Sequence, residues 1–214
     1  MRPSYFSSVR WWVGPILLTV TALCFDAADR LLRDGLLVTG LADEPAHLAT
    51  GALGLLVARR FIDAPQRFYV AAIIASVAID FDHIPLYLGF GAQDQRPITH
   101  SLATVAVFAI AAVAIRRHRA VLAGVVVGLL LHFARDIVEG PPGVRMLWPI
   151  QQTAWTAGYW WWLGMILFLL FAELVLGGLK VPRTRPRMFD RQDRRPIPAA
   201  AEPEMVTAPS EPGR

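Results

Sequence analysis

Six strongly apolar segments occupy most of the chain before residue 180 and restrict what it can fold into. They are Trp11–Phe25, Ala46–Ala58, Phe68–Ile79, Leu102–Ile115, Ala120–Leu131 and Tyr159–Leu179. Only the last reaches the ~20 residues of a comfortable membrane span, so the pattern allows four to six spans. A chain that is 55% hydrophobic is too apolar for an ordinary soluble domain. We therefore predict an all-α, polytopic membrane protein with about six transmembrane helices.

The basic residues favour six spans and give the helices a direction. If the segments alternate and the N-terminus is cytoplasmic, 16 of the 21 Lys and Arg residues lie on the cytoplasmic side. Cytoplasmic loops carry such an excess in membrane proteins. We expect a multi-pass membrane protein with both termini in the cytoplasm. The net charge of +4 comes from these loops and from the C-terminal tail, so we expect no nucleic-acid partner.

Composition divides the chain into three regions. Residues 1–42 are predicted to hold a membrane segment and a connecting helix, and residues 43–179 a helical membrane domain. Residues 180–214 are basic and rich in proline, which predicts a disordered cytoplasmic tail. Tryptophans stand at the start of the first and last apolar segments: Trp11, Trp12, Trp160, Trp161 and Trp162. We expect them to form an aromatic belt at the membrane interface.

Four of the five histidines lie in short polar clusters at the ends of apolar segments. The clusters are Asp43-Glu44-x-x-His47, Asp80-x-Asp82-His83, Thr99-His100-Ser101 and His132-x-x-x-Asp136. Ionisable groups are costly at membrane depth and commonly mark a functional site there. Histidine and carboxylate without thiol is ligand chemistry for a divalent ion such as zinc, manganese or iron. The single cysteine, Cys24, excludes a Cys-based zinc site.

The spacing of each cluster suggests individual roles. His132 and Asp136 are four apart, so a helix presents both on one face, either as metal ligands or as a structural hydrogen-bonded pair. Asp80, Asp82 and His83 supply three potential ligands at a helix end, although one carboxylate can instead orient a histidine.

The other two clusters stand where helices are expected to begin. His47 is the ligand candidate of its cluster, and Asp43 and Glu44 are placed to cap a helix that begins near Pro45. His100 is expected to point from a first helical turn towards the other clusters, and either neighbouring hydroxyl can cap that helix.

The alternating topology places all four clusters on the extracytoplasmic side of the membrane. The expected metal ligands are His47, Asp80, Asp82, His83, His100, His132 and Asp136. Asp80 or Glu139 is expected to accept a proton, and Arg96 to hold an anionic group. His118 lies among arginines and is expected to be solvated. Glu173, inside the last apolar segment, requires a partner but is not expected in the site.

Read in order, these motifs resemble a family of bacterial inner-membrane metal-dependent hydrolases. The corresponding stretches are Ala46–His47, Ala78–His83, Gln95–Ser101, His132–Asp136 and Gly143–Pro149. The resemblance covers about residues 43 to 150 and implies hydrolysis at a metal centre in the bacterial inner membrane. Two positions differ: Gln95 stands where the family has its first histidine of the third motif, and Pro97 where it has glycine.

Together these features predict a membrane-bound hydrolase that uses one or two divalent ions to activate water. Zinc is the preferred metal, and manganese and iron are the alternatives. Membrane lipids are the expected partners, and a lipid or lipid-linked ester or phosphoester is the expected substrate. The first alternative is a binding or transport protein for metal or protons. The second is a degenerate relative with a structural metal, which the change at Gln95 keeps open.

Overall fold

The computed structural model describes residues 11–31, 36–88, 90, 96–138 and 143–181, and all regular structure in these ranges is helical. The six longer helices are α1 (Val13–Leu31), α2 (Leu36–Ala58), α3 (Gln66–Ala78), α5 (Leu102–Ala114), α6 (Arg119–Asp136) and α7 (Tyr159–Gly178). Three short ones are η2 (Ile79–His83), α4 (Ile84–Tyr87) and η3 (Arg116–His118). Each longer helix overlaps one of the six apolar segments, although α1 and α2 extend beyond theirs, and the all-α prediction is confirmed.

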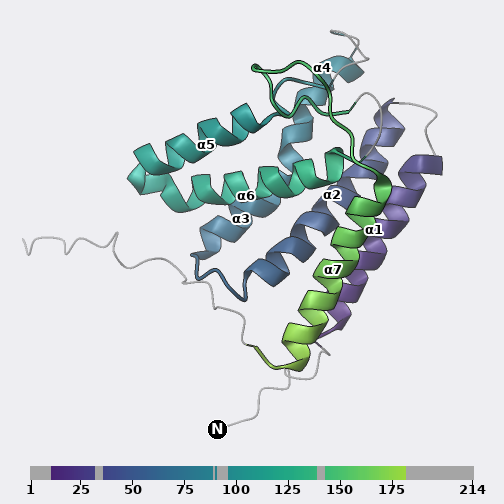
Figure 1. The fold of residues 1–214 in the computed structure, drawn as a ribbon, viewed down its shortest axis with the longest axis vertical. Coiled ribbons are helices and arrows are strands. Elements are labelled where there is room, and N and C mark those ends of the chain that lie inside the picture. The colour runs from purple at the N-terminus through teal and green to yellow at the C-terminus, as the bar shows by residue number, and fades with distance from the viewer. Residues whose placement is uncertain (1–10, 32–35, 89, 91–95, 139–142, 182–214) are drawn as a thin grey trace, which may run out of the picture.

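The helices form two groups that share α2. In one group α1, α2 and α7 pack around a buried cluster that includes Ala22, Leu53 and Ile166. In the other, α6 packs against α3, α5 and α2. Figure 1 shows α1 and α7 running along the long axis of the molecule, while α5 and α6 run across it. The fold is therefore not a single bundle of parallel helices.

Two helical stretches are long and apolar enough to cross a membrane, Arg116–Asp136 and Tyr159–Gly178. A third apolar helix, Leu102–Ala114, is shorter. These helices agree with a membrane protein, while the number of six spans stays a prediction. The tail beyond Val181 lies outside the described residues, and the domain boundary predicted after residue 42 falls inside the continuous helix α2.

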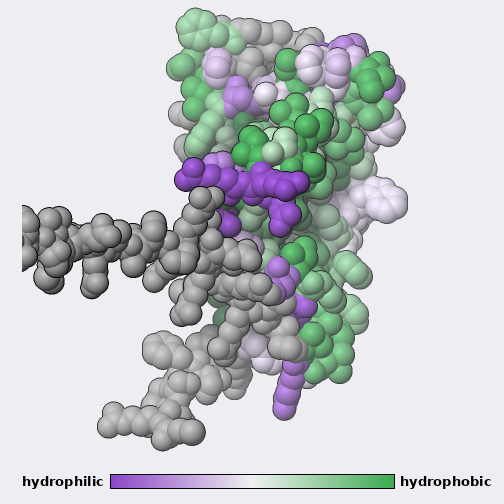
Figure 2. Space-filling view, turned by 90° about the vertical axis from the view of Figure 1, so that its left-hand side faces the viewer, coloured by the Kyte–Doolittle hydropathy of each residue, from purple (hydrophilic) through white to green (hydrophobic). Residues whose placement is uncertain are grey.

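Apolar side chains cover the outward faces of α5 and α7. Val107 and Val113 on α5 are 63% and 79% exposed, and Phe168 and Phe171 on α7 are 67% and 66% exposed. Figure 2 shows a hydrophilic band at the height where the turn between α5 and α6 faces the viewer, with hydrophobic surface above and below this band. Contiguous exposed apolar surface of this kind suits contact with lipid better than contact with water.

Small residues let α3 and α6 approach closely along matched stripes. Gly124 and Gly128 on α6 lie against the backbone carbonyls of Phe68 and Ala72 on α3, and a Cβ atom at either glycine would overlap the facing oxygen. Small residues spaced by four allow such close approach of helices in membranes. The contact fixes the register of α6 on α3.

The acidic residue within the last apolar segment has the partner that the sequence requires. Glu173 on α7 is fully buried and accepts two hydrogen bonds, each 2.7 Å, from the Nε and Nη2 atoms of Arg60. Arg60 stands just after α2, so this two-pronged pair ties α2 to α7 at the end of the molecule away from the histidines. Glu173 therefore lies outside the candidate site, as expected.

The tryptophans do not all lie at the surface. Trp160 and Trp161 are 77% exposed, as an interfacial belt requires. Trp162 is only 1% exposed and packs in the cluster between α1, α2 and α7. Its ring faces the guanidinium of Arg135, whose Cζ atom is 4.9 Å from a ring centroid. The prediction was wrong for Trp162, because the helix turns that side chain inward to cover a buried cation.

Candidate metal centre

The stripes that join α3 and α6 continue into the polar cluster. On α6 the contact stripe is Gly124, Gly128, His132 and Asp136, each four residues after the last. On α3 and η2 the facing stripe is Phe68, Ala72, Ser76 and Asp80. Residues four apart lie on one helix face, so the packing that seats the glycines also brings His132 and Asp136 beside Ser76 and Asp80.

Four side-chain atoms from α3–η2, α6 and the segment before α5 form a compact group. The Nε2 atoms of His100 and His132 are 3.3 Å apart. Asp80 Oδ1 lies 3.1 Å from the first and 3.5 Å from the second. Asp136 Oδ2 lies 3.5 Å from the first and 3.1 Å from the second. We call His100, His132, Asp80 and Asp136 the buried quartet.

These distances are those expected between ligands of one metal ion. Ligands about 2.0–2.1 Å from a tetrahedral zinc ion stand about 3.3–3.4 Å from one another. The five distances that join the two imidazoles to each other and to the two carboxylates are 3.1–3.5 Å, so two triangles of donor atoms share one edge. Two imidazoles and two carboxylates also carry the charge that balances a divalent cation. The quartet therefore fits a divalent ion in both geometry and charge.

The outer nitrogens of both imidazoles are held by neighbouring acceptors. His132 Nδ1 is 3.1 Å from the backbone carbonyl of Ser76, to which it donates its proton when Nε2 is unprotonated. His100 Nδ1 is 3.3 Å from Asp82 Oδ2. Metal-binding histidines are usually oriented by a carbonyl or carboxylate on the other nitrogen. Both side chains are fully buried, so these contacts leave each Nε2 directed into the quartet.

A second group of potential ligands adjoins the first. Asp82, His83 and His100 place one ligand atom each within 4.8 Å of the others, and His83 Nδ1 is 3.0 Å from Asp82 Oδ1. We call these three the outer triad. Its Asp82 and His83 side chains are 22% and 15% exposed, whereas the quartet residues on α6 are fully buried. Three protein ligands leave coordination positions for water or substrate, as in catalytic zinc sites.

His47 lies on the other side of Asp136. Its Nε2 atom is 3.3 Å from Asp136 Oδ1 and 3.0 Å from Asp43 Oδ2, and its ring stacks on His132 with centroids 4.1 Å apart. His47, His132 and Asp136 also form a group that could hold an ion. The structure thus brings all seven predicted ligand residues into one cluster.

Arg135 and Asp26 are site neighbours that the sequence analysis missed. The buried Arg135 Nη2 atom is 2.9 Å from Asp43 Oδ1 and 2.8 Å from Asp26 Oδ1. Asp43 in turn contacts His47, so the ion pairs link α1 to the cluster through α2 and α6. The acidic side chain of Asp26 within the first apolar segment was the signal that could have indicated this link.

The structure places some of the predicted catalytic residues in the cluster, while others lie outside the described residues. Arg96 lies in the cluster, with Nη1 3.0 Å from Asp136 Oδ1. Asp80 belongs to the quartet. Glu139 and the departure at Gln95 lie outside the described residues. Glu44, which was interpreted only as a cap, lies beside Asp80, and its buried Oε2 atom makes no hydrogen bond in the described structure.

Two capping predictions were wrong. Helix α2 begins at Leu36, so Asp43 and Glu44 stand inside it rather than at its start, and Pro45 is an interior proline. Ser101 does occupy the N-cap position of α5, but its side chain makes no capping hydrogen bond. The hydroxyl of Thr99 donates to Asp82 instead. In both places the polar groups serve the cluster, which packing assembles from other helices.

His118 agrees with its prediction. It lies in the short helix η3 between α5 and α6, is exposed, and has arginines on both sides. It is therefore the one described histidine that stands apart from the cluster.

The charges in the cluster hold one imidazole protonated when no ion is present. Burial alone would lower the pKa of His100, but its contacts with Asp80 and Asp82 outweigh burial and raise the pKa to about 9. Burial likewise opposes ionisation of Asp82, yet His100 and His83 hold the pKa of that carboxyl below its usual range. At neutral pH the metal-free cluster therefore has a charged Asp82 and a protonated His100.

We expect metal affinity to rise with pH. A cation must displace the His100 proton, so the apparent affinity should increase about tenfold per pH unit from pH 6 to 9 and level off above the pKa of about 9. Titration of detergent-purified protein with zinc at several pH values measures this slope. A pH-independent affinity over this range would show that His100 is not a ligand.

An all-helical membrane protein with a buried His/Asp cluster able to hold a divalent ion is the class that this fold and site define. The chain belongs to the family described as YdjM inner membrane protein, whose model matches residues 43–198. No curated protein and no solved structure matches the chain. The family places the protein in the inner membrane, and its description names no activity.

Proposed function

We propose that this protein is a membrane-bound metal-dependent hydrolase. The observation that carries the proposal is the buried quartet, whose imidazole and carboxylate atoms stand at the spacing of metal ligands beside an outer triad of three donors. Zinc suits two nitrogens and two oxygens in this geometry, while manganese and iron accept the same ligand types. The ion is an inferred cofactor, and the hydrolytic activity is inferred from the chemistry of its ligands.

The two groups suit different tasks. Four protein ligands close the coordination shell, as in structural zinc sites, so the quartet suits an ion that orders the cluster. The outer triad has open positions and is more exposed. A divalent ion in the triad would lower the pKa of a bound water towards about 7 and polarise an ester group. We place the reacting centre at the triad.

The chain's own residues supply the remaining chemistry. Arg96 has a guanidinium at the edge of the cluster and can orient an anionic group such as a phosphate. Glu44 stands outside both ligand groups, beside Asp80, and is a carboxyl group available for proton transfer when Asp80 binds an ion. Asp82 holds the imidazoles of His83 and His100 in position. These roles make water attack on an ester the reaction that the cluster supports best.

The proposed side of the membrane follows from the charges of the loops. The quartet and triad lie at the end of α3 and α6 opposite Arg67, at the start of α3, and Arg116, in η3 before α6. If basic turns face the cytoplasm, the cluster faces the extracytoplasmic side. Membrane lipids and lipid-linked esters are the molecules that such a site would meet.

A non-catalytic metal protein is the second candidate, and the closed quartet is the observation that favours it. A structural ion needs all four ligands from the protein, which the quartet supplies. The outer triad is what distinguishes the two proposals, because a purely structural site has no use for a second, more open group of ligands.

The His83→Ala variant tests the hydrolase proposal. It removes one triad ligand and leaves the quartet intact, so we expect one equivalent of metal to remain while turnover of lipid esters falls at least about 100-fold, more than loss of an orienting contact costs. Metal content and hydrolysis are measured on the same detergent-purified sample. His118→Ala is the matched control, since His118 is exposed and distant, and should leave both unchanged. Full activity in His83→Ala would exclude the triad as the reacting centre.

A further inference from the structure

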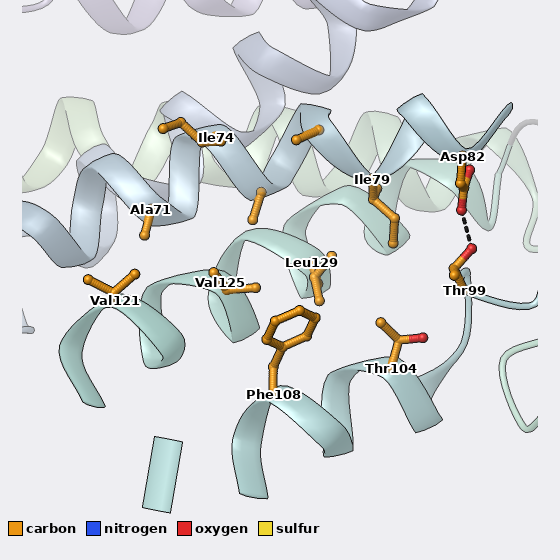
Figure 3. A pocket seen from close by; sticks show the side chains of 12 residues that line it. Ala71, Ile74, Ile79, Asp82, Thr99, Thr104, Phe108, Val121, Val125 and Leu129 are labelled. Atoms are coloured by element: carbon orange, nitrogen blue, oxygen red, sulfur yellow. Dashed lines mark hydrogen bonds between the residues drawn. The ribbon is translucent and has the colours of Figure 1, made fainter. Parts of the chain in front are cut away.

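An apolar groove runs between α3, α5 and α6 and ends at the outer triad. Its volume is about 520 Å³, within the range of about 300–1,000 Å³ typical of small-molecule sites. Figure 3 shows Ala71 and Val121 at one end, Val125 and Phe108 along its length, and Asp82 with Thr99 at the other end. The groove therefore has one long apolar part and one polar end.

The polar end is part of the candidate metal centre. Asp82 accepts a hydrogen bond from Thr99 and lies 3.3 Å from the Nδ1 atom of His100. Both Asp82 and His100 belong to the outer triad. A molecule that fills the groove would thus place the group at its polar end next to the triad.

The apolar part has the shape and surroundings of a site for a hydrocarbon chain. Val121 and Leu129 are eight residues apart on α6, which at about 1.5 Å per residue makes the groove about 12 Å long. Ile74, which also lines it, is 58% exposed, and α5 carries the outward apolar face described above. A lipid chain could enter from the bilayer without crossing water.

We propose that the substrate is an ester of a single-chain amphiphile, with its hydrocarbon chain in this groove and its ester beside Asp82 and Thr99. This inference rests on the proposed hydrolase function. In the reaction the water oxygen bonds to the acyl carbon or phosphorus, the bond to the leaving oxygen breaks, and that oxygen takes up a proton. Neither an oxidant nor a reductant is needed.

Chain-length selectivity tests the groove by activity. The assay compares wild type, Val121→Phe and Val125→Phe on esters that share one head group and differ in chain length. Because Val121 lies at the far end, Val121→Phe should lower kcat/KM at least tenfold for long chains and leave short chains unchanged. Val125→Phe, one turn closer to Asp82, should also lower kcat/KM for esters with chains of medium length. Val107→Phe, on the outward face of α5, is the matched control and should leave kcat/KM unchanged for every chain length.

Photolabelling tests the groove without hydrolysis. A long-chain fatty acid with a photoreactive group at its chain end is added to metal-stripped protein, and labelled peptides are mapped. Adducts should concentrate in α3 and α6 near Val121 and fall at least tenfold in Val121→Phe. Adducts spread equally over the exposed Phe168 and Phe171 of α7 would show adventitious lipid contact and overturn the inference.

The two readouts separate this inference from the function on which it rests. Labelling in the groove together with no hydrolysis of any ester would retain the groove as a chain site and remove the hydrolase proposal. Hydrolysis with the same chain-length profile in wild type and both groove variants would retain the hydrolase and overturn the groove. If Val121→Phe does not fold, Ile74→Phe fills the groove from an exposed position and answers the same question.

Discussion

The His132→Ala, Asp136→Ala double variant should lose the ion of the buried quartet. Each of these residues supplies one of the four donor atoms of the quartet, and both side chains are fully buried. Changing an orienting residue already costs about 10–100-fold in metal affinity, so removing two direct ligands should cost far more. The measurement is metal content by mass spectrometry after purification in detergent. Wild type should hold one to two equivalents, and the double variant at least one fewer.

A graded comparison makes this result specific. Asp82→Asn keeps all four quartet ligands and weakens the contact to His100 Nδ1, so it should lower the metal affinity of the quartet by about 10–100-fold. Because Asp82 is also a ligand of the outer triad, the same variant should lose any ion held there. His118→Ala should match wild type. If wild type contained no stoichiometric metal even after reconstitution with zinc, manganese or iron, the quartet would be a network of hydrogen bonds and ion pairs, and the hydrolase proposal would lose its basis.

The sequence predicted the residues of the cluster because polar groups are conspicuous in apolar helices. His132 and Asp136 follow a nearly uninterrupted apolar run, and their spacing alone puts them on one face. Alternating helix directions then placed four clusters at one end of the molecule. The structure brings these clusters together, although metal binding itself stays a prediction.

The division of labour within the cluster could not be predicted in the same way. Atoms from His100, His132, Asp80 and Asp136 meet only because α3 and α6 pack in one register, which depends on contacts between residues about 56 apart in the chain, such as Ser76 and His132. The ion pairs of Arg135 with Asp26 and Asp43 are likewise tertiary. Spacing within one helix carries no information on such partners.

The start of α2 shows a different limit. Asp43, Glu44 and Pro45 have the composition of a helix start, and local preference places a cap there. The chain instead continues the helix from Leu36. Asp43 makes its contacts with His47 one turn on and with Arg135 across the interface. The tertiary contact of Asp43 therefore accompanies a helix that local capping preference does not predict.

Gly128→Ala should disrupt the cluster from one turn away. A Cβ atom at residue 128 would overlap the backbone carbonyl oxygen of Ala72, which cannot rotate aside as a side chain can. Separating α6 from α3 would weaken the His132 contact with the Ser76 carbonyl, because both stripes continue from this point. We expect a loss of about 1–3 kcal/mol in stability, typical of overpacking, and about 10–100-fold weaker metal binding from the lost orientation of His132. Thermal unfolding in detergent and zinc titration measure the two effects.

Gly164→Ala is the matched control, because the same methyl group is added within a helix where nothing lies within 4 Å of the new Cβ atom. Replacing an interior helical glycine by alanine generally favours the helix by about 0.5–1 kcal/mol, so this variant should be as stable as wild type or more stable, with unchanged metal binding. Equal behaviour of the two variants would contradict the close approach of α3 and α6. If Gly128→Ala lost stability but kept full metal affinity, the glycine would serve only packing, and the quartet would be held in place by its other contacts. Loss of both in Gly128→Ala alone would show that the register of two helices determines the geometry of the metal centre.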